Sequence, residues 1–224
     1  MRQALAIDAL TAIYGGLAQR YDWQHRLITF ASDQRGRRLL VEQSVREGDR
    51  VLDAGAGTGS TALMAARRVG PSGKVTLFDL SDEMLDVARD KAALAGLEER
   101  LDFYGGDMVR LPFPDGLFDV VLSTYSLCPL YDPARGALEL YRVLRPGGRL
   151  GCAHSTEPEH RLTRWLADRV EDIAWRLPWL SMGCRAVDVL PVLIGAGARV
   201  QFIKRIGFPL WPFVVFVVEK PAHT

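Results

Sequence analysis

Residues 50–154 alternate between short, nearly all apolar runs and amphipathic segments. Strands are predicted for the apolar runs, which are 50–54, 74–80, 101–107, 118–124 and 149–154. Helices are predicted for the segments between them, at 60–69, 81–96 and 133–144. Strands that are joined through helices need right-handed crossovers, and apolar strands need cover on both faces. The pattern therefore predicts a doubly wound α/β fold with a mostly parallel sheet.

The alternation ends after residue 155. An amphipathic helix is predicted over 161–177, a proline-containing helix over 185–197, and strands over 199–206 and 211–220. The link between these two strands is too short for a helix, so we expect them to pair antiparallel. Residues 1–48 are predicted to be helical, with a loop or short break at 14–24. We expect one domain over 1–224, with 1–48 as an N-terminal helical lid and 155–197 as substrate-cap helices.

Bulk composition narrows the function classes. The chain has 28 basic and 27 acidic residues, and this balance gives no reason to expect a nucleic-acid partner. The arginine cluster "RGRR" at 35–38 is interpreted as a solvated helix face. The three cysteines lack C-x-x-C spacing, which argues against a disulfide framework or a metal site. Residues 1–20 lack the apolar core of a signal peptide, and no apolar run approaches the roughly 20 residues needed to span a bilayer. We therefore expect a cytoplasmic protein.

A glycine-rich loop follows the first predicted strand, in "VLDAGAGTGS" at 51–60. In an open α/β sheet, ligands bind at the carboxyl ends of strands, which is where this loop lies. Its spacing, Gly55-x-Gly57-x-Gly59, matches neither the dinucleotide G-x-G-x-x-G pattern nor the phosphate loop that ends in G-K-[ST]. Asp53 would repel a pyrophosphate, but it could hold a cation or order the N–H groups of the loop. The loop therefore fits a ligand with an amine and a carboxylate better than one with phosphates.

Two further acids stand at strand ends. Asp79 ends the second strand, where a carboxylate can accept both hydroxyls of a ribose. Asp107 ends the third strand and could accept a hydrogen bond from the exocyclic amine of a purine. Leu80, Met84 and Met108 offer apolar contact to the faces of the base. An amino acid, a ribose and an adenine together describe S-adenosylmethionine.

Four motifs in order, "VLDAGAGTGS", "LFDLSDEM", "GDMVRLPFPDGLFDVVLS" and "LYRVLRPGGRL", resemble the class I S-adenosylmethionine-dependent methyltransferases. The resemblance covers roughly residues 50–154 and is greatest to the ubiquinone/menaquinone biosynthesis C-methyltransferases. It implies a Rossmann-like fold with a seven-stranded sheet whose last strand is antiparallel. It also implies S-adenosylmethionine as cofactor and S-adenosylhomocysteine as product.

The resemblance also assigns positions in the site. It places Gly55, Gly57 and Thr58 against the methionine part of the cofactor, and Thr124 where that branch has a cofactor-contacting serine. The segment "YGGLAQRYD" resembles an N-terminal tyrosine segment that folds over the site. The predicted cofactor-binding residues are Asp53, Gly55, Ala56, Gly57, Thr58, Asp79, Leu80, Met84, Gly106, Asp107, Met108 and Thr124. The segment after 154 departs from the quinone enzymes and is similar to small thiol- and lipid-modifying, membrane-associated methyltransferases, which leaves the acceptor open.

Three residues are proposed for catalysis. His154 ends the fifth predicted strand on the ligand side, and its ordinary pKa of about 6.5 suits a proton acceptor. The plainer interpretation is a hydrogen-bonded histidine at a strand end. Tyr14 and Tyr21 are the second choice for a base.

We therefore expect methyl transfer to a small apolar or aromatic acceptor, such as a quinol, phenol, thiol or lipid head group. One alternative is an NAD-type oxidoreductase, against which the glycine spacing and Asp53 count. The other is a binding module that keeps the cofactor pocket but has lost an acceptor site. Peripheral membrane contact and a homodimer are further expectations about partners.

Overall fold

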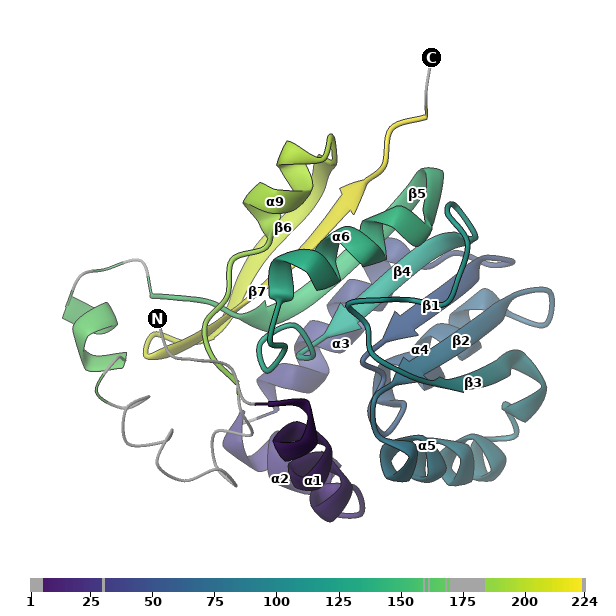
Figure 1. Cartoon of the computed structure of the whole chain (residues 1–224), viewed down its shortest axis with the longest axis horizontal. Coiled ribbons are helices and arrows are strands. Elements are labelled where there is room, and N and C mark those ends of the chain that lie inside the picture. Colours follow the sequence, from purple (N-terminus) through teal and green to yellow (C-terminus); the bar gives the residue numbers. More distant parts are fainter. Residues whose placement is uncertain are drawn as a thin grey trace.

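The computed structural model describes residues 6–29, 31–158, 160, 162–167, 169 and 184–222. Their strands form a single seven-stranded sheet with the order β3-β2-β1-β4-β5-β7-β6 (Figure 1). All neighbouring strands pair parallel except β7, which is antiparallel to both β5 and β6. The strands are β1 Arg50–Ala54, β2 Lys74–Asp79, β3 Leu101–Gly105, β4 Phe118–Thr124, β5 Leu144–Ser155, β6 Arg199–Phe208 and β7 Trp211–Glu219. The predicted mostly parallel, doubly wound sheet with an antiparallel last strand is confirmed.

Helices cover both faces of the sheet. One face packs against α3, α4 and α5, and the other packs against α6 and α9. The helices α1 and α2 lie near the carboxyl ends of the parallel strands (Figure 1). The bounds are α1 Ile7–Leu17, α2 Tyr21–Ile28, α3 Ser32–Ser44, α4 Ser60–Val69, α5 Asp82–Ala95, α6 Pro133–Val143 and α9 Leu190–Gly195, with a short 3-10 helix at Glu98–Arg100.

The pleat of β1 explains why its sequence is almost entirely apolar. Successive side chains of a strand point to opposite faces of the sheet. Val51 accordingly joins the core under α3, α4 and α5, whereas Leu52 joins the core under α6 and α9. Both side chains are fully buried. A strand that is covered on both faces needs apolar residues at every position, and this is the signal that made the central strands predictable.

Most predicted elements lie within a few residues of the observed ones. Ser81 caps α5, since its hydroxyl accepts a hydrogen bond from the Met84 backbone N–H, and Gly96 ends this helix in the left-handed conformation. The predicted antiparallel pairing of the last two strands is also confirmed. The fold of this central region therefore follows from local sequence signals.

Three predictions near the ends need correction. The break predicted at 14–24 is shorter, because α1 continues to Leu17 and α2 begins at Tyr21. The helix predicted over 185–197 is only α9, and the chain has no regular structure at 184–189. Residues 162–167 of the helix predicted over 161–177 are helical, while most of the rest of that segment lies outside the described residues.

Candidate functional site

A pocket of about 780 Å³, partly open to solvent, lies at the carboxyl ends of β1, β2 and β4. It collects almost all the predicted cofactor-binding residues, although they come from several loops. These are Gly55, Ala56, Gly57, Thr58, Asp79, Leu80, Met84, Gly106, Asp107, Met108 and Thr124. Tyr14 of α1 and Tyr21 of α2 line the same pocket. We call it the cofactor pocket below.

The glycine loop has left-handed backbone at each of its three glycines. A Cβ at Gly55 would overlap Ser126, and a Cβ at Gly59 would lie 2.9 Å from the Cβ of Ala88. A Cβ at Gly57 would meet no atom within 4 Å. Gly55 and Gly59 therefore serve the packing of the loop, whereas Gly57 leaves open space beside its backbone in the wall of the pocket.

The two strand-end acids are held in place by backbone donors. Asp79 accepts hydrogen bonds from the Gly57 N–H at 2.7 Å and the Ser81 N–H at 3.0 Å. Burial raises the pKa of Asp79. Asp107 accepts from the backbone N–H of Val109 at 3.0 Å and from the hydroxyl of Tyr131 at 2.7 Å. Both carboxylates are thus oriented before any ligand arrives, and each keeps lone pairs for one.

Arg37 is a pocket residue that the sequence reasoning missed. Its Nη1 donates to the hydroxyl of Thr61 at 2.9 Å and to that of Thr124 at 2.6 Å. The residue is only 5% exposed, so the interpretation of the arginine cluster as a solvated face is wrong at this position. Its Nε is buried and has no hydrogen-bond partner among the described residues. The signal that separates Arg37 from its neighbours is the spacing of four from Asp33 and from Val41, which places it on the buried side of α3.

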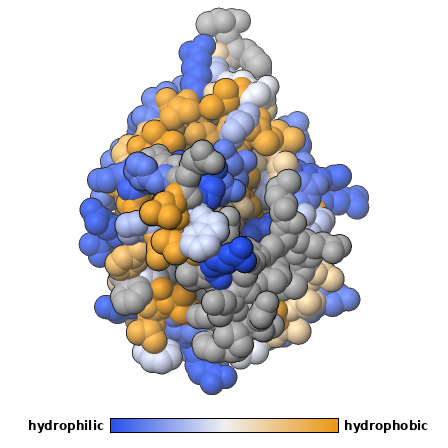
Figure 2. Space-filling model, turned by 90° about the vertical axis from the view of Figure 1, so that its left-hand side faces the viewer, coloured by the Kyte–Doolittle hydropathy of each residue, from blue (hydrophilic) through white to orange (hydrophobic). Residues whose placement is uncertain are grey.

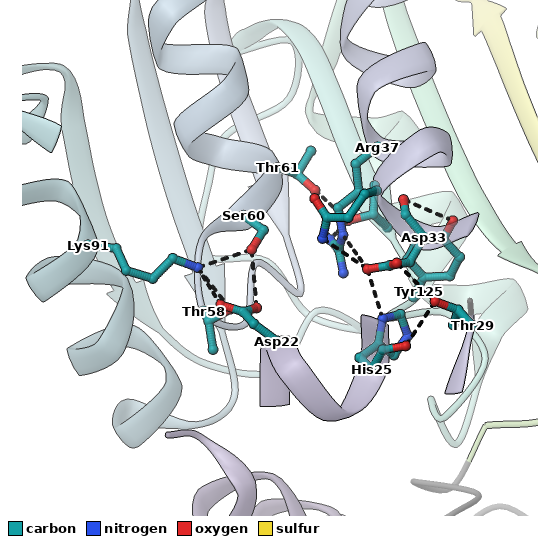
Figure 3. Close-up of polar contacts among 12 residues, drawn as sticks. Asp22, His25, Thr29, Asp33, Arg37, Thr58, Ser60, Thr61, Lys91 and Tyr125 are labelled. Carbon is teal, nitrogen blue, oxygen red and sulfur yellow. Dashed lines mark hydrogen bonds and ion pairs between the residues drawn. The ribbon is translucent and has the colours of Figure 1, made fainter. Parts of the chain in front are cut away.

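Helix α2 is tied to the glycine loop through Asp22. Its carboxylate accepts from the hydroxyls of Thr58 at 2.6 Å and Ser60 at 3.2 Å, and from Lys91 Nζ of α5 at 2.7 Å (Figure 3). Although burial acts to raise it, hydrogen bonds from Lys91 and Thr58 hold the pKa of Asp22 below its usual value. The carboxylate is therefore ionised at neutral pH and links three elements around the mouth of the pocket. Figure 3 shows this cluster beside a second one around Arg37 and Asp33.

His154 lies away from the pocket. Its side chain is 1% exposed, its Nδ1 lies 3.0 Å from the carbonyl oxygen of Ser155, and its ring contacts Phe216 edge-on. Burial lowers its pKa. The prediction that it faces the substrate needs correction. The alternation of β5 turns His154 toward the face that α6 and α9 cover, on the same side as Cys152.

Asp53 also stays outside the pocket lining. It is fully buried, on the side of β1 that α3 and α4 cover, because it lies two residues from Val51. Neither carboxylate oxygen has a hydrogen bond of standard geometry within the described residues, although the Ala62 backbone is close enough to favour the charge weakly. Burial raises the pKa of Asp53 to about 7, while the charge of Arg37 acts to lower it. The Asp53 carboxylate therefore does not face the pocket.

Tyr14 and Tyr21 reach the pocket but are poor bases. Their rings lie 6.0 Å apart, and burial raises the pKa of both phenols well above the ordinary value. A phenol with a raised pKa stays protonated at neutral pH, so it lacks the phenolate form that a general base needs. Both side chains line the pocket, and burial disfavours the phenolate form of each.

The described part of the chain shows neither a metal-binding cluster nor a membrane-spanning helix. It holds no group of three or more histidine, cysteine or acidic residues placed to bind a metal ion. In the same part of the chain, no helix is both long and apolar enough to cross a bilayer.

One pocket is lined by the backbone of the glycine loop, by an acid at the end of β2 and by an acid after β3. This arrangement is typical of the Rossmann-like methyltransferase fold. Solved structures share this fold. A SAM dependent methyltransferase from Aquifex aeolicus has a TM-score of 0.62 and 23% identity, and the match covers 93% of this chain and 98% of that one. The [4+2]-cyclase SpnF has a TM-score of 0.69 and 24% identity, with 86% and 82% covered.

Sequence comparison identifies the family. The model of the ubiE/COQ5 methyltransferase family matches residues 3–167, so the chain belongs to this family. The chain is 34% identical over 164 residues to the ubiquinone/menaquinone biosynthesis C-methyltransferase UbiE of Marinomonas sp. (strain MWYL1). That match covers 73% of this chain and 65% of the relative.

Proposed function

We propose that this chain is an S-adenosylmethionine-dependent methyltransferase that acts on a small, apolar or aromatic, quinone-related acceptor. The observation that supports it most is the convergence of Gly57, Asp79, Asp107 and Arg37 on one pocket. Family membership agrees with this activity and does not favour an NAD-type oxidoreductase.

The residues present fit the chemistry of the cofactor. Arg37 is a buried cation in the pocket wall whose Nε lies 3.9 Å from Asp33 Oδ2 but makes no hydrogen bond, and this suits the α-carboxylate of a bound amino acid. Asp79 suits the ribose hydroxyls, and Asp107 suits the adenine amine. Met84 and Met108 line the pocket where the faces of the base would need apolar contact.

When bound, the cofactor supplies a methyl group that the electron pair of an acceptor can attack, because the positively charged sulfur leaves as a neutral thioether. Because this methyl group is already electrophilic, the protein's part is to align the acceptor and exclude water. Leu10, Tyr14 and Tyr21 of the N-terminal helices cover the pocket, and the Asp22 cluster fixes α2 beside the glycine loop. We infer that these two helices form the lid that the sequence predicted for 1–48, while α3 belongs to the layer against the sheet.

The role of Arg37 gives a sharp test of this proposal. Arg37→Met should weaken binding of S-adenosylhomocysteine by about 1.5–3 kcal/mol, but decarboxylated S-adenosylmethionine should lose much less. Arg38→Met is the matched control, because Arg38 is the exposed neighbour on the same helix. Arg37→Lys keeps the charge and tests whether a loss comes from misfolding. The proposal is refuted if calorimetry shows that the wild-type chain binds NAD but binds neither S-adenosylmethionine nor S-adenosylhomocysteine.

A binding module without catalysis is the remaining alternative. A methyl-transfer screen over quinols, phenols, thiols and amines separates the two, because a module would bind the cofactor and transfer nothing. The SpnF likeness concerns the fold alone and favours neither outcome.

The finer expectations about partners remain proposals. We infer a surface for peripheral membrane contact from exposed apolar side chains near the β6–β7 turn and in the 162–167 helix, including Phe208, Leu210, Leu162 and Trp165. Figure 2 views the molecule from this side, where hydrophobic and hydrophilic residues are mixed. A homodimer, a cytoplasmic location and a substrate cap at 155–197 are likewise proposals from the sequence.

A further inference from the structure

A second cavity, of about 460 Å³ with its opening to solvent included, lies beside the cofactor pocket. The two cavities share one wall residue, Tyr125, in the loop that follows β4. Trp211 and Phe213 of β7 and Phe208 of β6 give the second cavity an aromatic lining, while His25 of α2 supplies an ionisable group. Its lining suits one aromatic ring with a polar substituent.

Tyr125, which lines both cavities, has a strained conformation that its contacts maintain. Its φ is 60°, in the left-handed region that few non-glycine residues adopt. Phe213 packs edge-on at 5.3 Å, and the Arg37 guanidinium lies 5.1 Å from the ring centre. Gly36 makes room for the tyrosine hydroxyl, since a Cβ there would overlap it. Backbone strain of this kind persists only where the surroundings fix it, and it is concentrated at functional sites.

His25 and Asp33 form a buried pair at the edge of the second cavity. His25 Nδ1 lies 3.1 Å from Asp33 Oδ2, and the two residues are 5% and 1% exposed (Figure 3). Asp33 also accepts from the Thr29 hydroxyl at 2.9 Å and from Gln34 Nε2 at 3.0 Å. Although burial acts to raise it, the hydrogen bond from His25 and the charge of Arg37 hold the pKa of Asp33 well below its usual range. Asp33 is therefore a carboxylate at neutral pH.

An ionised Asp33 assigns the proton of the neutral imidazole to Nδ1. The other nitrogen, Nε2, is then a proton acceptor, and among the described residues no hydrogen bond to it occurs. Burial lowers the pKa of His25, while the hydrogen bond to Asp33 acts in the opposite direction. Tyr21 stacks on the ring at 5.2 Å and limits its rotation. The arrangement is that of an oriented general base, with Asp33 as the residue that positions it.

We propose that the second cavity holds the methyl acceptor, a hydroxylated aromatic ring, and that His25 removes the proton of its hydroxyl group. The O–H bond breaks, the proton moves to His25 Nε2, and the electron pair stays on the oxygen. The resulting phenolate oxygen, or the ring carbon beside it, is the nucleophile for the methyl group. After attack by carbon, that ring carbon releases its hydrogen as a proton to water, and the oxygen regains the proton from His25 Nε2. This inference rests on the proposed methyltransferase function and adds where the acceptor binds and which residue is its base.

Kinetics with a series of phenols of graded acidity test the base. His25→Gln should lower kcat at least about 100-fold with weakly acidic phenols, and much less with nitrophenols that are already ionised in the assay. Asp33→Asn should lower kcat in the same selective manner. The matched controls are His160→Gln and Asp86→Asn, which change exposed residues outside this cavity. Equal losses across the phenol series, or no loss, would overturn the role of His25.

An optical titration without the cofactor gives an independent measurement. 4-Nitrophenol absorbs differently as phenol and as phenolate, so its absorbance reports proton transfer in the complex. Wild-type protein should raise the phenolate fraction of bound 4-nitrophenol, and His25→Gln should abolish the rise. Trp211→Phe should reduce the quenching of tryptophan fluorescence that accompanies binding in this cavity. Binding that leaves the phenolate fraction unchanged contradicts the proposal.

The pH profile of the wild-type protein tests the same group without any substitution. The ionisable groups around His25 are Asp33 and Arg37 of α3, Tyr21 and Asp22 of α2, Tyr125, and Cys128 and Cys184 in the cavity wall. Because the pKa of His25 is lowered, kcat with weakly acidic phenols should rise with a midpoint below about 6.5 and then stay level. A rise that follows the acidity of each phenol instead would mean that no protein base acts.

The two proposals fail in different ways. If the wild-type chain binds no S-adenosylmethionine, the methyltransferase function fails, while the 4-nitrophenol titration still decides the role of His25. If methyl transfer occurs and His25→Gln keeps the full rate with every phenol, only the acceptor site fails.

Discussion

Two glycine-to-alanine substitutions in the glycine loop should have different effects, one mainly on stability and the other mainly on cofactor affinity. Gly57 and Gly59 both have left-handed backbone, with φ values of 52° and 75°. Placing alanine in this conformation costs about 1–2 kcal/mol at either position. At Gly59 the new methyl group would also press on Ala88 at 2.9 Å and on Leu77 at 3.2 Å. Overpacking of this kind costs about 1–3 kcal/mol more.

We therefore expect Gly59→Ala to lower the free energy of unfolding by about 2–5 kcal/mol, and Gly57→Ala by only about 1–2 kcal/mol. Cofactor affinity should show the opposite order. The methyl group of Gly57→Ala would occupy the open space beside the backbone in the pocket wall, so affinity for S-adenosylhomocysteine should fall at least tenfold, or about 1.4 kcal/mol.

Urea denaturation measures the stability of both variants, and calorimetry with S-adenosylhomocysteine measures affinity at a temperature where both are folded. Gly59→Ala serves as the control for general damage to the loop. Equal stability losses in the two variants would refute the packing argument. Wild-type affinity in Gly57→Ala would refute the proposed approach of the ligand to the Gly57 backbone.

Three other substitutions test the charges of the site. Asp22→Asn should lower the free energy of unfolding by about 0.2–1 kcal/mol, since the Asp22 side chain is 42% exposed and water screens its ion pair with Lys91. A double-mutant cycle with Lys91→Met measures the coupling energy of this pair, which should decrease at high salt. A coupling energy of zero at low salt would contradict the prediction. Burial raises the pKa of Asp53 to about 7 although Arg37 acts to lower it, so ionising Asp53 destabilises the native state increasingly as pH rises from about 4 to about 7. Asp53→Asn removes this destabilisation. The melting temperature of the variant minus that of the wild type should therefore increase as pH rises over that range, and a constant difference would show that Asp53 does not titrate over it. Asp79→Ala should weaken S-adenosylmethionine binding by about 1.5–3 kcal/mol, as measured by calorimetry, and unchanged affinity would contradict the ribose position.

Local signals in the sequence determined the central architecture and most of the cofactor pocket. Apolar runs at 74–80 and 118–124 become strands because both faces of the sheet are covered, and Ser81 and Gly96 bound α5 through cap interactions that depend on near neighbours only. Asp79 could be placed at the pocket because strand ends of a parallel sheet meet at one edge. Such features need no knowledge of distant contacts.

Only the tertiary structure decided which face each strand-end side chain occupies. His154 and Asp53 both stand near the carboxyl ends of strands, yet the pleat turns them into opposite sides of the core and away from the pocket. Arg37 shows the reverse, because an arginine from a charged cluster becomes a buried donor to Thr124, which lies 87 residues further along the chain.

The pair of His25 and Asp33 has the same origin. Sequence spacing alone does not join them, since they lie eight residues apart on separate helices. They meet because α2 and α3 pack against each other beside the loop of Tyr125. Strands and helix ends follow from interactions between near neighbours, whereas the direction of a side chain into a cavity depends on packing among elements far apart in the chain.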